Sequence, residues 1–396
     1  MNKRIYLDNA ATTRLSEEVY QEMQPYLMEH FGNPSSVYDL GADNKSALLQ
    51  ARKQIAHTLS CEPQSIYYTS GGTEADNWAL IGIAEQYQKR GKHIITTKIE
   101  HHAVLNSCEY LRTRGYDITY LDVDEQGYVN PQQVQQALRP DTILVSIMLA
   151  NNEIGTIEPI QEIGHILQHH SAIFHTDAVQ AYGHMEIPVN DWHIDLLSAS
   201  AHKFHGPKGI GFLYVRDGIR IPPYLHGGHQ ERGLRAGTEN VPAIVGMGKA
   251  AETAYLHLQK KQEKIAKLRD YMIYRMENEI TYCHRNGPRT NRLANNVNFS
   301  FQFVDGETLV ILLDMEGICA SAGSACTAGQ SIASHVIQAL HVPEEFARGT
   351  VRFTLSEDTS KEDIDITIDA LKKILDKNRS LNPRYQAFIQ QSSKFY

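Results

Sequence analysis

Residues 194–215 read IDLLSASAHKFHGPKGIGFLYV, in which two apolar runs enclose a turn that contains Lys203. The runs at 194–198 and 211–215 have the length and composition of buried β-strands. A lysine beside small residues at a strand end is sheltered from water, which lowers its pKa and makes a reactive neutral amine. An exposed lysine on a turn is the commoner case, but the flanking Ser200 and His202 favour the sheltered one. The stretch therefore predicts a lysine suited to imine chemistry.

The sequence around this stretch alternates strand-like runs with helix-length segments. Apolar or β-branched runs predict five more strands, at residues 65–69, 93–97, 118–123, 142–148 and 172–176. Two of the intervening segments have helical patterns, 73–89 and 159–169. Such alternation with continuously apolar strands is typical of a mostly parallel sheet that is covered on both faces. We therefore expect an α/β fold with a seven-stranded sheet and a ligand site at the carboxyl ends of its strands.

The pattern changes at Leu258, where a long, highly charged amphipathic helix is expected to begin. Strands are expected at 296–301 and 349–355, followed by a last helix that a capping box opens with Thr359 and Glu362. We therefore expect a large domain at 14–257 and a smaller α+β domain formed by 1–13 and 258–396.

Composition limits the function classes. The chain has 396 residues, 42% hydrophobic and 21% charged, with a formal net charge of −8. An acidic balance without a basic run argues against a nucleic-acid partner, and no apolar stretch approaches the roughly 20 residues of a membrane helix. Without a visible secretory signal, we expect a cytoplasmic protein. Five cysteines without a C-x-x-C pair indicate free thiols rather than disulfides.

Two further motifs complement Lys203. Gly71, Gly72 and Thr73 follow a predicted strand and open a helix, with Thr73 as its expected cap. Glycines and a helix N-terminus form a phosphate site in many proteins, although a plain turn explains this motif alone equally well. Asp177 ends another predicted strand, where it is either a helix cap or a buried acid. An imine lysine, an acid for the ring nitrogen and a phosphate cup together predict a pyridoxal phosphate site.

His101 and Cys326 are the remaining candidates. Glu100-His101-His102 lacks the i, i+4 spacing of a helical zinc motif and has no cysteine cluster, so we expect no metal. Stacking on a planar cofactor and proton transfer suit the imidazole of His101 better. Residues 320–330, ASAGSACTAGQ, surround Cys326 with tiny residues, which indicates an accessible thiol on a flexible loop at about 321–333.

These motifs resemble the cysteine desulfurases of the NifS/IscS type, in the group with a long cysteine loop. The resemblance implies a fold-type I pyridoxal phosphate enzyme of aminotransferase class V, and it runs almost from end to end. The segments that carry it are YLDNAATT (6–13), FGNPSS (31–36), TSGGTEADN (69–77), EHHAVL (100–105), NNEIG (151–155), HTDAVQ (175–180), SAHKFHGPKGIG (200–211), HGGHQERGLRAGTEN (226–240), SAGSACTAG (321–329) and VRFTLS (351–356).

The resemblance also implies a role for each matching residue. Lys203 binds the cofactor as an imine and later acts as a base, Asp177 pairs with the pyridine nitrogen, and Cys326 takes the sulfur of L-cysteine as a persulfide. His101 stacks on the ring and transfers protons. The other residues that hold the cofactor or the substrate carboxylate are Gly72, Thr73, Asn152, Gln180, Ser200, His202, Thr238 from the other subunit, and Arg352.

The implied partners follow from this chemistry. A homodimer is expected because Thr238 serves the neighbouring chain, and the persulfide passes to an acceptor protein, either an iron–sulfur scaffold or a tRNA-thiolation protein. Two alternatives remain open, a selenocysteine lyase of the same fold and a non-catalytic scaffold protein. The intact Lys203, Asp177, His101 and Cys326 argue against a scaffold.

Overall fold

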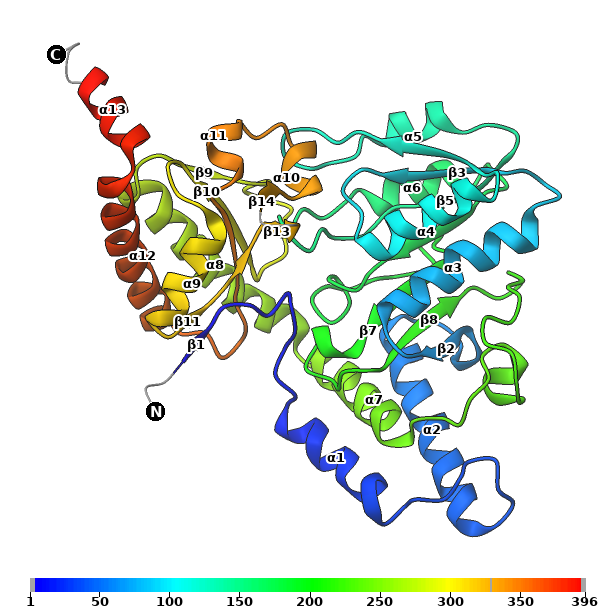
Figure 1. Ribbon diagram of the computed structural model, residues 1–396. Coiled ribbons are helices and arrows are strands. Elements are labelled where there is room, and N and C mark those ends of the chain that lie inside the picture. The colour runs from blue at the N-terminus through cyan, green and yellow to red at the C-terminus, as the bar shows by residue number, and fades with distance from the viewer. Residues whose placement is uncertain (1–3, 328–329, 393–396) are drawn as a thin grey trace.

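A seven-stranded sheet forms the centre of the larger lobe (Figure 1). The computed structural model describes residues 4–327 and 330–392, apart from the side chains of 324–332 and 392. The strands of the large sheet, in chain order, are β2 (Ile66–Thr69), β3 (His93–Thr97), β4 (Asp117–Leu121), β5 (Thr142–Ser146), β6 (Ile173–Asp177), β7 (Leu196–Ser200) and β8 (Gly211–Val215). All seven predicted strands are present, with ends that differ by a few residues, and the α/β prediction is confirmed.

The strand order β2-β8-β7-β6-β5-β3-β4 is parallel except at β8, which pairs antiparallel with both β7 and β2. The short connection 201–210 explains this exception, because a parallel crossover needs about a dozen residues or more. β2 consequently runs parallel to β7, and the carboxyl ends of β2, β3, β5, β6 and β7 meet at one edge. The turn that carries Lys203 lies at this edge.

Helices cover both faces of the sheet. On one face, Trp78 of α3 (Gly72–Tyr87) and Val104 of α4 (His102–Thr113) share a core with Ile94 and Leu144. The next residues along the same strands point to the opposite core, to which α2 (Asp39–Thr58), α6 (Ile160–Leu167) and α7 (Val241–Tyr255) contribute. α1 (Glu17–Met28) and α5 (Pro131–Ala137) add to that face. Burial on both faces explains why the strands are continuously apolar rather than alternating.

A smaller lobe is built around a four-stranded antiparallel sheet with the order β12-β15-β10-β9. Its strands are β9 (Cys283–Arg285), β10 (Asn296–Phe301), β12 (Ser321–Ala322) and β15 (Thr350–Thr354), and its helices are α8 (Leu258–Glu279), α9 (Gly306–Met315) and α12 (Lys361–Leu381). β1 (Ile5–Tyr6) pairs parallel with β11 (Ile318–Cys319), so both ends of the described chain contribute to this lobe. The remaining helices are α10 (His335–Ala339), α11 (Glu344–Ala347) and α13 (Pro383–Ser392).

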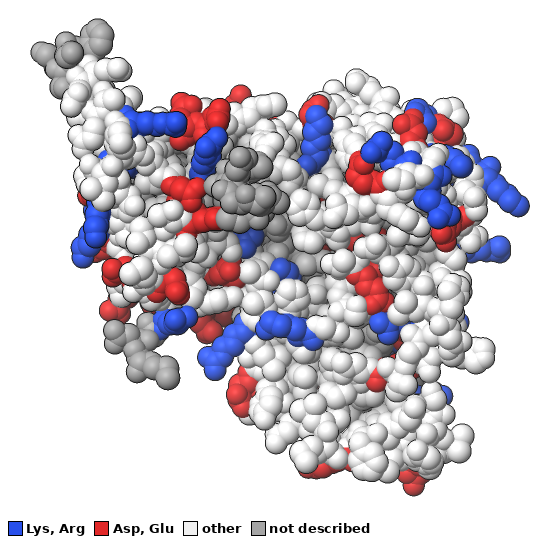
Figure 2. Space-filling view, in the orientation of Figure 1, with Lys and Arg blue, Asp and Glu red and all other residues white. Residues whose placement is uncertain are grey.

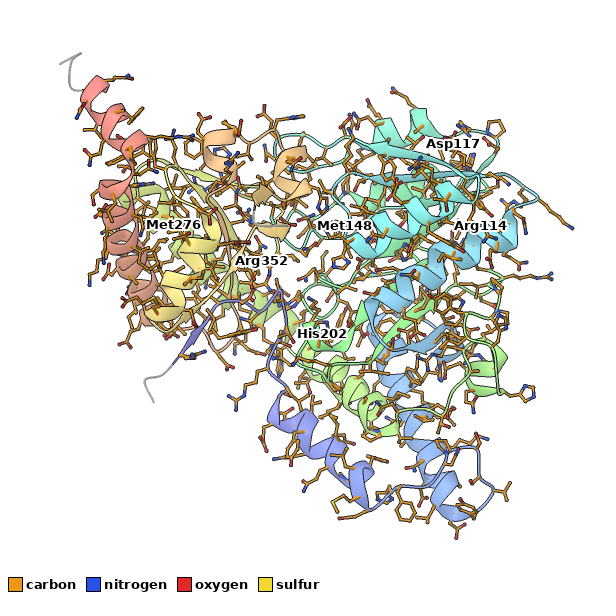
Figure 3. The ribbon with its side chains drawn as sticks, viewed as in Figure 1. Arg114, Asp117, Met148, His202, Met276 and Arg352 are labelled. Carbon is orange, nitrogen blue, oxygen red and sulfur yellow. The ribbon has the colours of Figure 1, made fainter. Side chains whose placement is uncertain are left out.

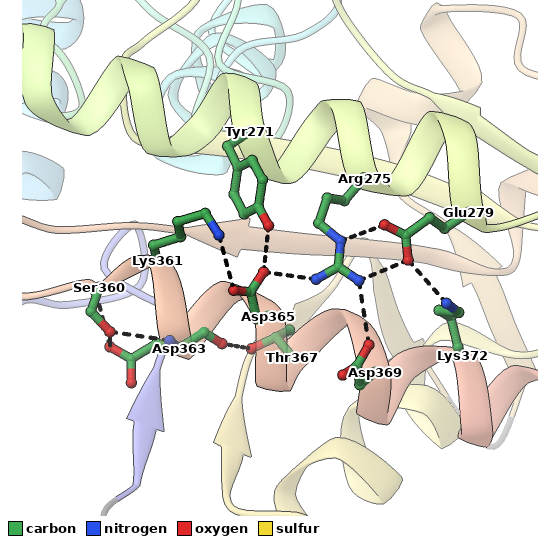
Figure 4. Close-up of polar contacts among 10 residues, drawn as sticks. All are labelled: Tyr271, Arg275, Glu279, Ser360, Lys361, Asp363, Asp365, Thr367, Asp369 and Lys372. Carbon is green, nitrogen blue, oxygen red and sulfur yellow. Dashed lines mark hydrogen bonds and ion pairs between the residues drawn. The ribbon is translucent and has the colours of Figure 1, made fainter.

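The capping box of α12 lies one residue later than predicted. Ser360, not Thr359, is the N-cap: its hydroxyl accepts from the backbone N–H of Asp363, and the Asp363 carboxylate accepts from the Ser360 N–H at 2.9 Å (Figure 4). The Thr359 hydroxyl is already used, because it accepts from the N–H of Ser356. Serine with aspartate makes the same reciprocal pair that the prediction assigned to Thr359 and Glu362.

Ion pairs join α8 to α12 on the outer side of the smaller lobe. Arg275 of α8 contacts Glu279 on its own helix, and Asp365 and Asp369 on α12, and Lys372 reaches Glu279 from α12 (Figure 4). Charges of both signs are interspersed over the face shown in Figure 2. No helix within residues 4–327 and 330–392 is long and apolar enough to cross a membrane.

Candidate functional site

A cavity of about 340 Å³ lies between the two lobes, at the edge where the parallel strands end. Figure 3 labels Met148 and His202 on the larger lobe and Arg352 on the smaller one, all of which line the cavity. The predicted site residues in its lining are Gly72, Thr73, His101, Asn152, Asp177, Gln180, Ser200, His202, Lys203 and Arg352. The cavity therefore brings together predicted residues from six segments that are distant in sequence.

Lys203 follows β7 in a short 3₁₀ turn and is mostly shielded from solvent. Its Nζ donates to the carbonyl oxygens of Ala10 at 2.6 Å and Ala11 at 2.9 Å. Burial, and then the charge of the nearby Arg352, lowers the pKa of Lys203 to about 8. The sheltered amine that the sequence predicts is thus present, with a pKa close to neutrality.

The segment with the two carbonyl groups crosses from one lobe to the other. Asp8 bridges to Thr354 in the smaller lobe, and the Ala10 N–H donates to the Thr354 hydroxyl at 2.8 Å. The Ala10 carbonyl also accepts from Gln180, and Thr13 donates to the His202 carbonyl. Because both lobes hold residues 8–13, this segment closes one wall of the cavity.

Asp177, at the end of β6, is buried beside a second carboxylate. One Asp177 oxygen accepts from the Val179 N–H at 2.9 Å, and no helix begins at this turn, so Asp177 is a buried acid rather than a helix cap. Burial raises the pKa of Asp177, whereas His101 and Lys203 lower it. Burial and the neighbouring Asp177 raise the pKa of Asp76 well above its ordinary value. Two buried carboxylates repel each other, and the pKa of Asp76 is raised more than that of Asp177, so Asp177 is the more readily ionised of the two.

His101 is the N-cap of α4, where its Nδ1 accepts from the Ala103 N–H at 3.1 Å. In the neutral ring Nε2 therefore carries the proton. Burial lowers the pKa of His101, and the neighbouring Lys203 also lowers it, although Asp177 opposes this. Ligand atoms of Asp76, His101 and Asp177 lie within 4.8 Å of one another, so these three side chains could also hold a metal ion. The expectation of no metal site therefore stays a prediction.

The N-terminus of α3 forms the end of the cavity next to Ser200. The N-cap is Gly71, not Thr73, which lies in the first turn of the helix. Gly71 has φ +154° and ψ −178°, a conformation that a residue with a side chain rarely adopts. A Cβ atom on Gly72 would lie 2.5 Å from Cγ2 of Val179. Only glycine fits at these two positions, and the free N–H groups that follow suit an anion.

Arg352 enters the cavity from β15 of the smaller lobe. Its Nη1 donates to the Asn152 carbonyl at 2.8 Å, and its Nη2 pairs with Asp8 at 3.1 Å. Its Nε is buried and has no hydrogen-bond partner among the described residues. A buried donor without an acceptor is costly, so this side of the guanidinium is suited to an incoming anionic group.

Among the predicted residues whose side chains the structure describes, Thr238 does not line this cavity. This residue is exposed. Cys326 belongs to β13 (Ser324–Thr327), and its side chain lies outside the described part of the structure. The backbone of β13 pairs with β14 (Gln330–Ala333) as a hairpin, with Cys326 opposite Ser331. The mobility of the segment at about 321–333 stays a prediction.

Sequence reasoning missed Asp76 and Asp8. Asp76 comes four residues after Gly72, so one turn of α3 brings it back toward the cavity, a spacing that the sequence contains. Asp8 becomes relevant only because β1 joins the smaller lobe and brings it to Arg352. No local sequence pattern predicts the ion pair between Asp8 and Arg352.

Comparison with known proteins identifies the family. The family described as Aminotransferase class-V matches residues 5–367. The chain belongs to this family. Proteins named cysteine desulfurase IscS are similar to it throughout: the one from Dictyoglomus turgidum is 51% identical over 386 residues, covering 98% of each chain. The one from Methanosarcina thermophila is 51% identical over 382 residues, covering 96% of this chain and 94% of its own.

Solved structures agree with this assignment to the class-V family. A protein titled NifS-like protein matches with a TM-score of 0.89 and 38% identity, covering 94% of this chain and all of its own. A structure titled SspA in complex with cysteine matches with a TM-score of 0.79 and 37% identity, covering 90% and 100%. The resemblance to the NifS/IscS type, inferred from the motifs, is confirmed.

Proposed function

We propose that this chain is a pyridoxal phosphate-dependent cysteine desulfurase. In the reaction, L-cysteine and the Cys326 thiol give L-alanine and a Cys326 persulfide, so that one sulfur atom moves from substrate to enzyme. The observation that carries the proposal is a single cavity that holds a low-pKa amine on Lys203, a buried acid on Asp177 and a helix N-terminus at Gly72. The names of the full-length relatives point to the same activity.

The residues of the cavity fit pyridoxal phosphate. The glycine cradle at the start of α3, with Ser200 and His202 beside it, suits a phosphate group, because a helix N-terminus attracts an anion. Asp177 would pair with the pyridine nitrogen, and Gln180 would hydrogen-bond the phenolic oxygen. Lys203 would hold the cofactor covalently. When bound, pyridoxal phosphate supplies an electron sink for the carbon atoms of the substrate.

Lys203 and His101 are suited to move protons. A pKa near 8 leaves an appreciable fraction of neutral Lys203 amine at neutral pH, which a base requires. His101 has a lowered pKa and carries its proton on Nε2, so the neutral ring can stack on a planar group and donate from that atom. Arg352 and Asn152 would orient the substrate through its carboxylate, because the buried Nε of Arg352 lacks an acceptor.

Cys326 is the proposed sulfur carrier, and three other cysteines are poor candidates. Burial raises the pKa of Cys61 to about 12 and that of Cys283 to about 11, and it also raises the pKa of Cys108. These three thiols stay protonated at neutral pH, whereas the thiolate is the nucleophile. The acceptor of the sulfur, in the cytoplasm, is proposed to be an iron–sulfur scaffold or a tRNA-thiolation protein.

We propose a homodimer of two-domain subunits. In each subunit, residues 14–257 form the large domain, and residues 1–13 and 258–396 form the small domain. Thr238 lies outside the cavity of its own chain, as a residue that serves a partner would. Large apolar side chains near the end of α1 and before α2 are exposed, which indicates a surface that another chain covers. They are Leu27, Met28, Phe31, Val37 and Tyr38.

Quantifying alanine and sulfide from L-cysteine tests the proposed function. The wild-type protein loaded with pyridoxal phosphate should produce both, and Lys203→Ala should produce neither. Cys326→Ala should keep the absorbance of bound cofactor and lose sulfide production. If the wild type forms no alanine, or if Cys326→Ala releases sulfide at the wild-type rate, the proposal is wrong. Preference for selenocysteine that survives in Cys326→Ala would instead identify a selenocysteine lyase.

A further inference from the structure

The Glu74 carboxylate joins two segments that lie far apart in sequence. Its Oε2 accepts from the backbone N–H of Ser70 at 2.8 Å. Arg235 forks onto the same carboxylate, from Nε to Oε1 at 2.9 Å and from Nη2 to Oε2 at 3.1 Å. The two side chains are only 10% and 22% exposed, so water screens this ion pair weakly. The segment around Arg235 is thereby fixed to the loop that enters α3.

Each joined segment belongs to a different half of a phosphate cup. Ser70 directly precedes the Gly71–Gly72 cradle of its own cavity. Arg235 lies three residues before Thr238, which is exposed and does not line that cavity. Under the proposed function, Thr238 completes the cup of the partner subunit. Within one subunit, the ion pair of Glu74 and Arg235 therefore connects two elements. One is the cofactor site of that subunit, and the other is the segment with Thr238, which serves the site of the partner subunit.

The segment that carries Arg235 is already anchored at its start. Glu231 is buried, pairs with Arg52 and accepts from the Tyr68 N–H at 2.9 Å. Glu231 and Arg232 both have positive φ angles, 45° and 61°, which side chains tolerate only where the surroundings hold them. Hydrogen bonds from the Ala236 N–H to the Leu225 carbonyl and from the Gly237 N–H to the Gln230 side chain also hold the segment. The Arg235 fork is the contact that ties this segment to the loop at the start of α3.

The negative charge of Glu74, in the first turn of α3, requires a positively charged partner. Burial raises the pKa of Glu74, but hydrogen bonds from Arg235 and Ser70 outweigh it and keep the pKa below its ordinary value. The carboxylate is therefore ionised in the first turn of the helix whose N-terminus faces the phosphate site. Without Arg235, its negative charge would repel a phosphate group bound there.

We propose that Glu74 and Arg235 are positioning residues of the cofactor site, and that their ion pair couples the two sites of the dimer. The pair holds the cradle loop of one subunit together with the segment that places Thr238 in the other. This inference rests on the proposed function, because it assumes pyridoxal phosphate and a dimer in which Thr238 crosses between subunits.

Titration of the apo-dimer with pyridoxal phosphate, followed by the absorbance of the imine on Lys203, tests the pair. Arg235→Gln should weaken cofactor affinity about tenfold, the scale of one charge-assisted hydrogen bond. Glu74→Gln/Arg235→Gln should regain part of this loss, because it also removes the unpaired negative charge. Arg216→Gln, which breaks the ion pair with Asp195 elsewhere in the lobe, is the matched control and should bind like the wild type.

Unchanged affinity in Arg235→Gln would overturn the proposal, and a double variant no tighter than the single one would overturn the charge argument. Sedimentation of each variant is the control that it is a folded dimer. If Arg235→Gln does not fold, Arg235→Lys replaces it, since lysine keeps the charge but lacks the fork. Wild-type protein that forms no imine would contradict the proposed function instead, so the two failures are distinguishable.

Mixed dimers test the coupling between sites directly. In a dimer of a wild-type subunit with a Lys203→Ala/Arg235→Gln subunit, only the wild-type subunit forms the imine, and its own Arg235 is intact. The reference is a dimer of a wild-type subunit with a Lys203→Ala subunit. Compared with this reference, the wild-type subunit of the first dimer should bind pyridoxal phosphate about threefold or more weakly, which is the scale of a typical coupling energy. Equal affinities in the two mixed dimers would show that Arg235 does not act on the partner site.

Discussion

Lys203 should react with pyridoxal phosphate at a pH well below the pH at which an exposed lysine reacts. Burial, and then the charge of Arg352, lowers its pKa from 10.5 to about 8. At pH 7, about a tenth of the Lys203 amines are then neutral, against about 0.03% for an ordinary lysine. Because only the neutral amine attacks the aldehyde, capture of the cofactor at pH 7 should be about 300-fold faster than an unshifted lysine would allow.

The assay is the rate at which imine absorbance appears when apo-protein is mixed with pyridoxal phosphate between pH 6 and pH 11. Loss of the ammonium proton should raise the rate with pH, and the rate should level off above about pH 8. Arg352→Gln removes a neighbouring positive charge, so its profile should shift to higher pH. Arg216→Gln, on an ion pair remote from Lys203, should leave the profile unchanged.

A rate that keeps rising through pH 10 in the wild type would refute the reasoning that burial lowers the pKa of Lys203. An Arg352→Gln profile that moves to lower pH would refute the assigned role of the Arg352 charge. Both results are independent of desulfurase activity.

Three further substitutions have defined outcomes. Gly72→Ala should weaken pyridoxal phosphate affinity about tenfold in a binding titration, because its Cβ would lie 2.5 Å from Cγ2 of Val179 and overpacking costs about 1–3 kcal/mol; an unchanged affinity would contradict the cradle. Arg352→Lys should raise the KM for L-cysteine about tenfold with the bound-cofactor spectrum unchanged, since lysine cannot form a bidentate pair with a carboxylate; steady-state kinetics with an unaltered KM would exclude that role. Arg275→Ala should lower the free energy of unfolding in urea by about 1–2 kcal/mol, because it breaks a network of ion pairs between α8 and α12. Arg348→Ala, which breaks one exposed pair, is its control and should change stability little.

Much of the larger lobe follows from local sequence patterns. Buried parallel strands are continuously apolar, so the runs ending at Thr97 and Asp177 could be recognised individually, and parallel strands place their ends at one edge. The start of the long charged helix at Leu258 was predictable for a similar reason, because its apolar residues recur at helical spacing. Lys203 and Asp177 could therefore be placed in one site from the sequence.

Features that depend on tertiary contacts were not predictable in the same way. The antiparallel strand β8 results from the length of a connection, and the shift of the cap from Thr359 to Ser360 depends on which hydroxyl is already hydrogen-bonded. The raised pKa of Asp76 results from its burial beside Asp177, which no local sequence pattern predicts. The hairpin around Cys326 arises from pairing between the short runs 324–327 and 330–333, neither of which has the pattern of a strand by itself.

The central claim is that sulfur leaves L-cysteine and is carried by one thiol of this chain. Mass spectrometry of peptides from the pyridoxal phosphate-loaded protein, treated with one equivalent of L-cysteine without reductant, measures this directly. The peptide that contains Cys326 should gain the mass of one sulfur atom. The peptides that contain Cys61, Cys108 and Cys283 should not, because burial keeps these thiols protonated. Sulfur on one of these three cysteines, or on no cysteine at all while alanine is formed, would contradict the account.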